Sequence, residues 1–200
     1  MQILLLLVLA EACSPASAAT FNSLKISRDG DTYHLSADVY LNAPPLQVYR
    51  VLTDYNHLTR ISNVIRRSHL LGRPDAHTAT VYVESRACVL FFCHTIKETQ
   101  NVAESPPADL GATAIPAQSN VKLAESTWHL QADGQGTRMQ WNLTIEPEFW
   151  VPPLIGPVLV EGDLRAEGEY SARAIEKLAR QWAHLPPNSA ATNAPVAQTR

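Results

Sequence analysis

Residues 33–55, YHLSADVYLNAPPLQVYRVLTDY, decide the fold of this chain. Residues 33, 35, 37, 39 and 41 are apolar and alternate with mainly polar residues, the pattern of a β-strand with one buried face. Pro44 and Pro45 end this strand, and proline is favourable in the first turn of a helix. The apolar residues that follow recur at near-helical spacing up to Tyr55. The stretch therefore predicts a strand followed by a short helix, and a second short helical turn is expected at residues 58–61.

The middle of the chain is predicted to form further strands. Residues 64–71, 79–89 and 94–102 are rich in branched residues, as is typical of strands. Residues 105–118 contain three prolines and are predicted to be loop-like. Residues 126–130 and 139–145 alternate on either side of an Asp-Gly-Gln-Gly turn, which predicts a hairpin. Its second strand should turn four side chains toward the core: Met139, Trp141, Leu143 and Ile145.

The last ordered segment is predicted to be a long helix at residues 153–183. One helical stripe collects its apolar and small residues: Ile155, Leu159, Gly162, Ala166, Tyr170, Ala174, Leu178 and Trp182. Strands in succession, closed by one long helix, indicate an α+β fold with an antiparallel sheet.

The two ends of the chain differ from this domain. Residues 3–10 form an apolar run too short to span a bilayer, and Ala16-Ser17-Ala18 is a cleavage-site pattern, so residues 1–18 are interpreted as a signal peptide. No Lys or Arg precedes the run, and a buried N-terminal strand or helix is the alternative. Lipidation at Cys13 fits less well, because Glu11 stands where a small residue is expected. The folded domain is assigned to residues 21–184, residues 185–200 have the composition of a disordered tail, and the predicted location is the periplasm.

Composition excludes one class of partner. With 16 Lys and Arg against 19 Asp and Glu, the formal charge is −3. The chain has no basic stripe of the kind that neutralises phosphates, so nucleic acid is not an expected partner.

Two cysteines remain in the chain after the predicted leader. Cys88 and Cys93 are an even pair in an exported protein, which favours a disulfide. Two free thiols in the core are the first alternative. A metal site that includes His94 is the second, but further ligands at recognisable spacing are lacking.

Parts of the sequence resemble a known superfamily. Residues 37–45, followed by Val48 to Tyr55, resemble the opening of START-like (SRPBCC, Bet v 1-like) proteins, and residues 175–179 resemble their last helix. The nearest branch is the coenzyme Q-binding group of polyketide cyclase/dehydrase and lipid-transport proteins. The resemblance implies a helix-grip fold, in which an antiparallel sheet curls around the long helix and leaves an apolar cavity. It also implies a hydrophobic ligand, quinone-like or acyl. The predicted leader and the cysteine pair depart from intracellular members.

The candidate ligand-binding residues lie on the predicted hairpin, the long helix and the loop between them. Trp128 and Trp141 should point inward, either as plain core or as cavity wall. Gly162 and Ala166, with Leu159 on the same stripe, allow a close approach by a ligand or by a bulky strand residue. The proline-rich loop before the helix is a lid or portal, a membrane-touching tip or a rigid connector, and it carries Phe149, Trp150 and Ile155. Polar candidates for the cavity are Glu84, Arg86 and Asp163, although a solvated position is the favoured interpretation of each.

No catalytic signature is present in the sequence. The G-x-S-x-G, H-E-x-x-H, G-x-G-x-x-G and P-loop patterns are all missing, and no histidine pair has metal-binding spacing. We therefore predict no catalytic residue, metal or cofactor. A module that binds a hydrophobic small molecule or lipid, with transient membrane contact, is the leading hypothesis. The alternatives are a polyketide cyclase or aromatase and an envelope interaction protein without a ligand.

Overall fold

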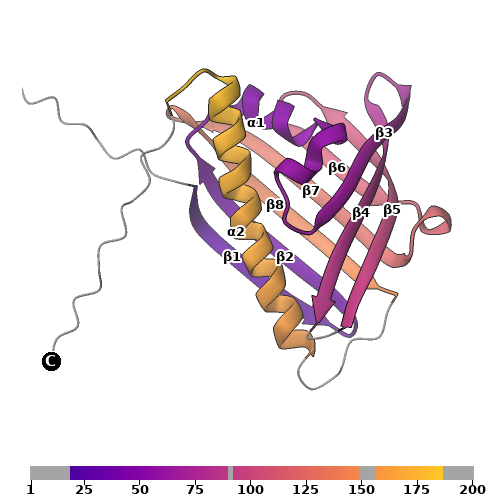
Figure 1. Cartoon of the computed structure of the whole chain (residues 1–200). Coiled ribbons are helices and arrows are strands. Elements are labelled where there is room, and N and C mark those ends of the chain that lie inside the picture. The colour runs from indigo at the N-terminus through magenta and orange to yellow at the C-terminus, as the bar shows by residue number, and fades with distance from the viewer. Residues whose placement is uncertain (1–18, 90–91, 149–155, 187–200) are drawn as a thin grey trace, which may run out of the picture.

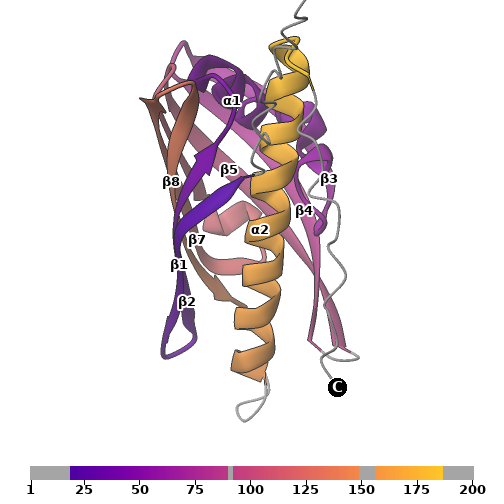
Figure 2. The ribbon, with the colours of Figure 1, turned by 90° about the vertical axis from the view of Figure 1, so that its left-hand side faces the viewer.

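The computed structural model describes residues 19–89, 92–148 and 156–186. Within them, eight strands form one sheet in the order β1-β2-β8-β7-β6-β5-β4-β3, and each neighbouring pair is antiparallel. The strands are β1 (Thr20–Asp29), β2 (Thr32–Leu41), β3 (Ile65–Asp75), β4 (Thr78–Val89), β5 (Phe92–Ser105), β6 (Asp109–Ala114), β7 (Val121–Asp133) and β8 (Gly136–Pro147). The helices are α1 (Pro45–Leu52), the 3-10 helices η1 (Tyr55–Arg60) and η2 (Pro116–Gln118), and α2 (Gly156–Trp182). The sheet curls around α2 (Figures 1 and 2), as the sequence predicts.

The alternation in β2 and β8 places the core on the concave face of the sheet. The five alternating apolar residues of β2 are all 3% exposed or less: Tyr33, Leu35, Ala37, Val39 and Leu41. In β8, Met139 and Trp141 pair with Val39 and Ala37, so they share this face, and the outward residues Arg138, Gln140 and Asn142 are exposed. The predicted facing of β8 is confirmed.

A polar anchor fixes the loop between β2 and α1 to the end of α2. The Asn42 amide donates a hydrogen bond to Glu176 Oε2 at 2.7 Å, and Arg180 Nη1 donates to the Asn42 carbonyl at 2.6 Å. Glu176 is only 3% exposed and Arg180 only 7%. A buried carboxylate and guanidinium need such partners. The anchor therefore fixes how α2 lies across the sheet.

Two strands depart from the sequence-based expectation. Residues 109–114 were expected in a loop, but they form β6, whose inward residues Leu110, Ala112 and Ala114 are buried. The strand is short and its inward residues are mostly small, so its local signal is weak beside Pro106 and Pro107. Strand β1 is not predicted from the sequence either, because it is an edge strand whose residues are largely exposed and whose alternation is interrupted by a bulge between Phe21 and Ser23.

The predicted disulfide is present. Cys88 and Cys93 lie directly opposite each other in the β4–β5 hairpin and are bonded. Among the described residues, no helix has the length and apolar character needed to cross a membrane. The predicted signal peptide and most of the predicted tail lie outside the described residues.

Candidate functional site

A cavity of about 620 Å³ lies between the concave face of the sheet and α2. This volume is within the range of roughly 300–1,000 Å³ that is usual for small-molecule sites. Strands β4 to β8 form most of the wall, α1 and η1 cover one end, and α2 covers the open side of the curl. The wall is mainly apolar and includes Val81, Val83, Ile96, Val102, Leu110, Met139, Leu143 and Ile175.

Two tryptophans lie side by side on the wall, as the sequence predicts. Trp128 and Trp141 are paired across β7 and β8, with ring centroids 6.4 Å apart and planes inclined by 4°. Both are half-buried and both line the cavity. Trp141 Nε1 is buried and has no hydrogen-bond partner among the described residues. The two parallel indoles offer aromatic surface to a ligand in the cavity.

The part of α2 that faces the cavity differs from the predicted stripe. Ala166 lines the cavity, but Leu159 and Gly162 are not among the lining residues. The expectation of a close approach at Gly162 is wrong, because this residue is exposed and an added Cβ would meet nothing within 4 Å. Gly168 has that role instead: an added Cβ there would lie 3.4 Å from the Trp141 ring and 3.8 Å from Leu35.

The helix is rotated relative to the predicted stripe for a physical reason. Its buried face contains Gly168, Ala172, Ile175 and Ala179, together with Glu176 and Arg180 of the polar anchor. A hydrophobic stripe drawn from the sequence assigns these two charged residues to the surface. The true face therefore lies beside the predicted one.

A pair of polar side chains stands on the otherwise apolar wall contributed by β5. Glu98 and Gln100 are two residues apart on one face of the strand, and both line the cavity. Glu98 is 8% exposed, and Gln100 Nε2 donates a hydrogen bond to its Oε2 at 2.8 Å. Burial raises the pKa of the Glu98 carboxyl, and the hydrogen bond from Gln100 opposes this only in part. Sequence reasoning missed Glu98, although Ile96-Glu98-Gln100-Val102 is an alternating row that places polar residues on an apolar face.

A hydrogen-bonded cluster around the buried carboxylate of Glu104 closes the end of the cavity near α1. The Tyr55 hydroxyl, on a ring that lines the cavity, donates to Glu104 Oε1 at 2.6 Å. Arg73 Nη1 donates to both carboxylate oxygens of Glu104 at 3.0 Å. Burial, followed by the bond to Glu104, raises the pKa of Tyr55, and burial raises the pKa of nearby Tyr49 to about 12. Both carboxylate oxygens of Glu104 have protein partners, so we interpret this end as structural; the buried Tyr49 hydroxyl has no hydrogen-bond partner among the described residues.

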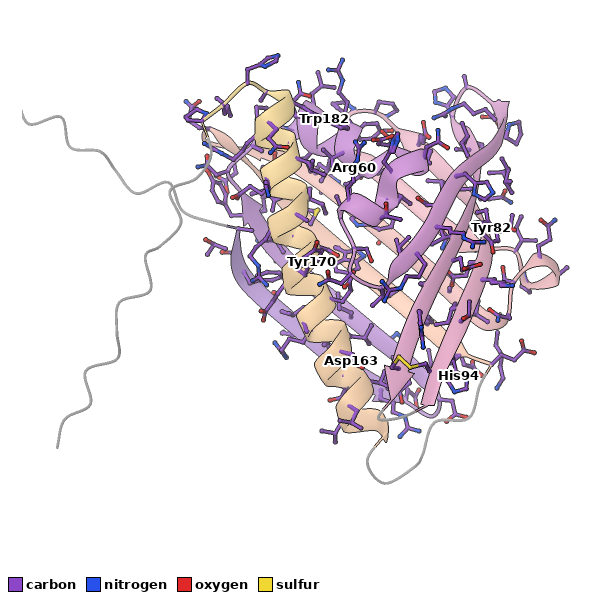
Figure 3. The ribbon with its side chains drawn as sticks, viewed as in Figure 1. Arg60, Tyr82, His94, Asp163, Tyr170 and Trp182 are labelled. Atoms are coloured by element: carbon purple, nitrogen blue, oxygen red, sulfur yellow. A yellow bond between two sulfur atoms is a disulfide. The ribbon has the colours of Figure 1, made fainter. Side chains whose placement is uncertain are left out.

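The other end of the cavity reaches the surface. Arg86, Cys88, Asp163 and Ala166 all line the cavity and are all exposed, which identifies its mouth. They lie where α2 begins, beside the disulfide end of β4 and β5; Figure 3 shows Asp163 and the disulfide at this end. Desolvation raises the pKa of the Asp163 carboxyl.

Three further candidates lie in the loop between β8 and α2. Phe149, Trp150 and Ile155 are outside the described residues. Pro147 and Val160, on either side of that loop, line the cavity. Glu84 is not a lining residue, and its carboxylate accepts a hydrogen bond from the Tyr82 hydroxyl at 3.1 Å. In the described part of the chain, no three His, Cys, Asp or Glu side chains are grouped as a metal site would require.

The antiparallel sheet curled around one long helix, with a cavity between them, defines the helix-grip class of START and Bet v 1-like proteins. A family model described as polyketide cyclase / dehydrase and lipid transport matches residues 32–182, and the chain belongs to that family.

Solved structures with this fold are similar over most of the chain. The STAR-related lipid transfer protein (fragment 25–204) of Xanthomonas axonopodis is 16% identical, with a TM-score of 0.58, and the match covers 76% of this chain and 98% of that one. The Zhui aromatase/cyclase of Streptomyces sp. R1128 is 13% identical, with a TM-score of 0.62, over 76% and 96% of the two chains. Human STARD10 is 9% identical, with a TM-score of 0.59, over 80% and 76%. No curated protein matches the sequence. At these identities the likeness is one of fold.

Proposed function

We propose that this protein binds a hydrophobic small molecule or lipid, quinone-like or acyl, in the cavity between the sheet and α2. The cavity itself carries the proposal: it has a volume of about 620 Å³ and a mainly apolar wall. Transfer of apolar surface from water into such a site is worth roughly 25 cal/mol per Å². A ligand of lipid size therefore needs few polar contacts to bind.

The arrangement of the two ends in the described residues supports a route for the ligand. The cluster of Tyr55, Glu104 and Arg73 closes the end near α1, and the mouth is at the start of α2. We propose that the ligand enters there and lies along the Trp128–Trp141 surface. The β4–β5 hairpin ends on the same side of the molecule (Figures 1 and 2), so a transient contact with a membrane at this end would bring the mouth to its source of ligand.

Export is part of the proposal. The leader-like residues 1–18 support it. The bond between Cys88 and Cys93 also supports it, because disulfides persist in oxidising compartments such as the periplasm. We propose that the mature protein acts there.

A second candidate is a polyketide cyclase or aromatase. The family description and the likeness to the Zhui aromatase/cyclase favour it, and Glu98 and Gln100 supply polar groups inside the cavity. Conversion of a poly-β-ketone substrate to an aromatic product by the purified protein would establish this activity.

Mass spectrometry of an organic extract of the purified protein tests the proposed function. We expect a hydrophobic compound at close to one molecule per chain, released by solvent and absent from a matched extract of an unrelated exported protein. No such compound in the extract, combined with no uptake of added quinone or acyl probes, would contradict the proposal.

A further inference from the structure

Glu98 is the one carboxyl group placed deep on the described wall of the cavity, away from its mouth. Across the β4–β5 pair it faces Val83, and along β5 its neighbours on the same face are Ile96 and Gln100. Gln100 Nε2 donates to Oε2, no described residue makes a hydrogen bond to Oε1, and Oε1 is not fully buried, so it borders the open space of the cavity. A buried carboxyl group normally has partners for both oxygens. One half of this group is therefore left for something in the cavity.

The charges around the cavity favour a neutral occupant. Besides Glu98, the charged lining residues are Arg86 on β4 and Asp163 and Glu167 on α2. Arg86 and Asp163 are exposed at the mouth, and Glu167 accepts hydrogen bonds from the Asn63 amide at 3.2 Å. No buried cation lines the described part of the cavity, and acidic residues outnumber basic ones there. A buried anionic head group would lack a counter-ion.

We propose that Glu98, positioned by Gln100, is the polar contact of the cavity for its ligand. It donates a hydrogen bond from Oε1 to the carbonyl oxygen of a neutral, mainly apolar ligand. The inference rests on the proposed function. It narrows the class of ligand to ketones, quinones, esters or amides and excludes free carboxylates.

The surroundings of Glu98 favour its protonated form. A carboxylate can only accept hydrogen bonds, whereas a carboxylic acid has one donor. Burial raises the pKa of Glu98, and its protonated form keeps Oε2 as the acceptor for Gln100 while Oε1 carries the proton. An apolar ligand beside the group excludes more water and strengthens this preference.

Three fluorescent probes of one shape test the proposal: 2-acetylanthracene, 2-ethylanthracene and 2-anthracenecarboxylate. The first presents a carbonyl, the second lacks it, and the third is an anion. The full chain is titrated with each probe, as wild type and as the variants Glu98→Leu and Glu98→Gln. Glu125→Gln, an exposed carboxylate on β7, is the matched control.

We expect wild type to bind the acetyl probe more tightly than the carboxylate. In Glu98→Leu, the ratio of acetyl to ethyl affinity should fall roughly tenfold, which is the loss of one buried hydrogen bond. Glu98→Gln should keep the ratio of acetyl to ethyl affinity, because the Gln amide can donate a hydrogen bond. In this variant the ratio should no longer depend on pH. In wild type the ratio should decline as the pH rises through the pKa of Glu98. Glu125→Gln should change neither.

Three results would overturn the inference. The first is an unchanged ratio in Glu98→Leu, the second is an equal pH profile in wild type and Glu98→Gln, and the third is tighter binding of the carboxylate than of the acetyl probe. If Glu98→Leu does not fold, the comparison of the two pH profiles decides. Failure of wild type to bind any of the probes would instead contradict the proposed function itself.

Discussion

At the scale of single residues, the position of Glu98 on the cavity wall should lower the stability of the fold when its carboxyl group is ionised. A group whose pKa is higher in the folded than in the unfolded state stabilises the fold fully below its unfolded pKa. That contribution is lost as the pH rises through the folded-state pKa. Burial raises the pKa of Glu98 above its ordinary value of 4.5. The wild type should therefore lose stability, from this group, as the pH rises above about 4.5.

Replacing Glu98 by Gln removes this loss. We expect the free energy of unfolding of Glu98→Gln, measured in urea between pH 4 and pH 8, to rise relative to wild type as the pH increases. Asp163 also has a raised pKa but titrates in both proteins, so the difference between them isolates Glu98. A constant difference across this range would show that the carboxyl is as well solvated in the fold as in the unfolded chain.

The sequence predicted some of these residues and not others. Trp128 and Trp141 were predicted to point inward because strand alternation fixes the side of each residue directly. Glu98 obeys the same alternation, but a charged residue on an apolar face is assigned to the surface unless the whole row is considered. Gly162 was assigned to a close approach that occurs at Gly168, because burial of Glu176 and Arg180 rotates the helix.

At the scale of elements, the contact between α2 and the sheet depends on Gly168. Replacing Gly168 by Leu would force atoms into Trp141 and Leu35, because even a Cβ lies 3.4 Å and 3.8 Å from them. We expect this variant to be destabilised by about 1–3 kcal/mol, measured by urea unfolding.

Gly162→Leu is the matched control on the same helix. It meets open space and gains helix propensity, so its stability should rise by roughly 0.5–1 kcal/mol. Equal destabilisation of the two variants would contradict the assignment of the packed face of α2.

The β4–β5 hairpin depends on its disulfide. The bond closes a loop of about six residues, for which chain entropy predicts roughly 2 kcal/mol of stabilisation. We expect the double variant Cys88→Ser, Cys93→Ser to lose about that amount in urea unfolding without reductant. Wild type in reductant should behave like the variant. Quantitative alkylation of both thiols in the unreduced native protein would refute the pairing.

The elements themselves were predicted with unequal success. Strands β2, β7 and β8 and the long helix α2 have long periodic signals, and their predicted positions agree with the structure. Strand β6 is short, and three of its residues are glycine or alanine, so only its pairing with β5 and β7 identifies it as a strand. Strand β1 pairs only with β2, and few of its side chains are buried. Its own sequence therefore does not indicate its pairing with β2.

At the scale of the whole molecule, the fold forms a cavity with one closed end and one open end. The sheet and α2 enclose the cavity, the Tyr55–Glu104–Arg73 cluster closes the end near α1, and the mouth lies beside the disulfide. Family membership and fold could be inferred from the sequence. The placement of Glu98 on the cavity wall and the position of the mouth required the three-dimensional structure, because the cavity is formed by strands and a helix that lie far apart in the chain.

Tryptophan fluorescence in the presence of decyl-ubiquinone tests whether a hydrophobic ligand binds in the cavity. The chain has four tryptophans, and a Trp150→Phe, Trp182→Phe background leaves only Trp128 and Trp141 on the cavity wall. Two helix variants extend the test: Ala166→Trp narrows the mouth, and Arg165→Trp places the same bulk at an exposed position that does not line the cavity. Because both variants add an indole, their binding curves are compared by dissociation constant rather than by intensity. We expect saturable quenching at one quinone per chain, with the affinity weakened at least tenfold by Ala166→Trp and little changed by Arg165→Trp. Quenching that does not saturate, or a dissociation constant that Ala166→Trp leaves unchanged, would contradict ligand binding in this cavity.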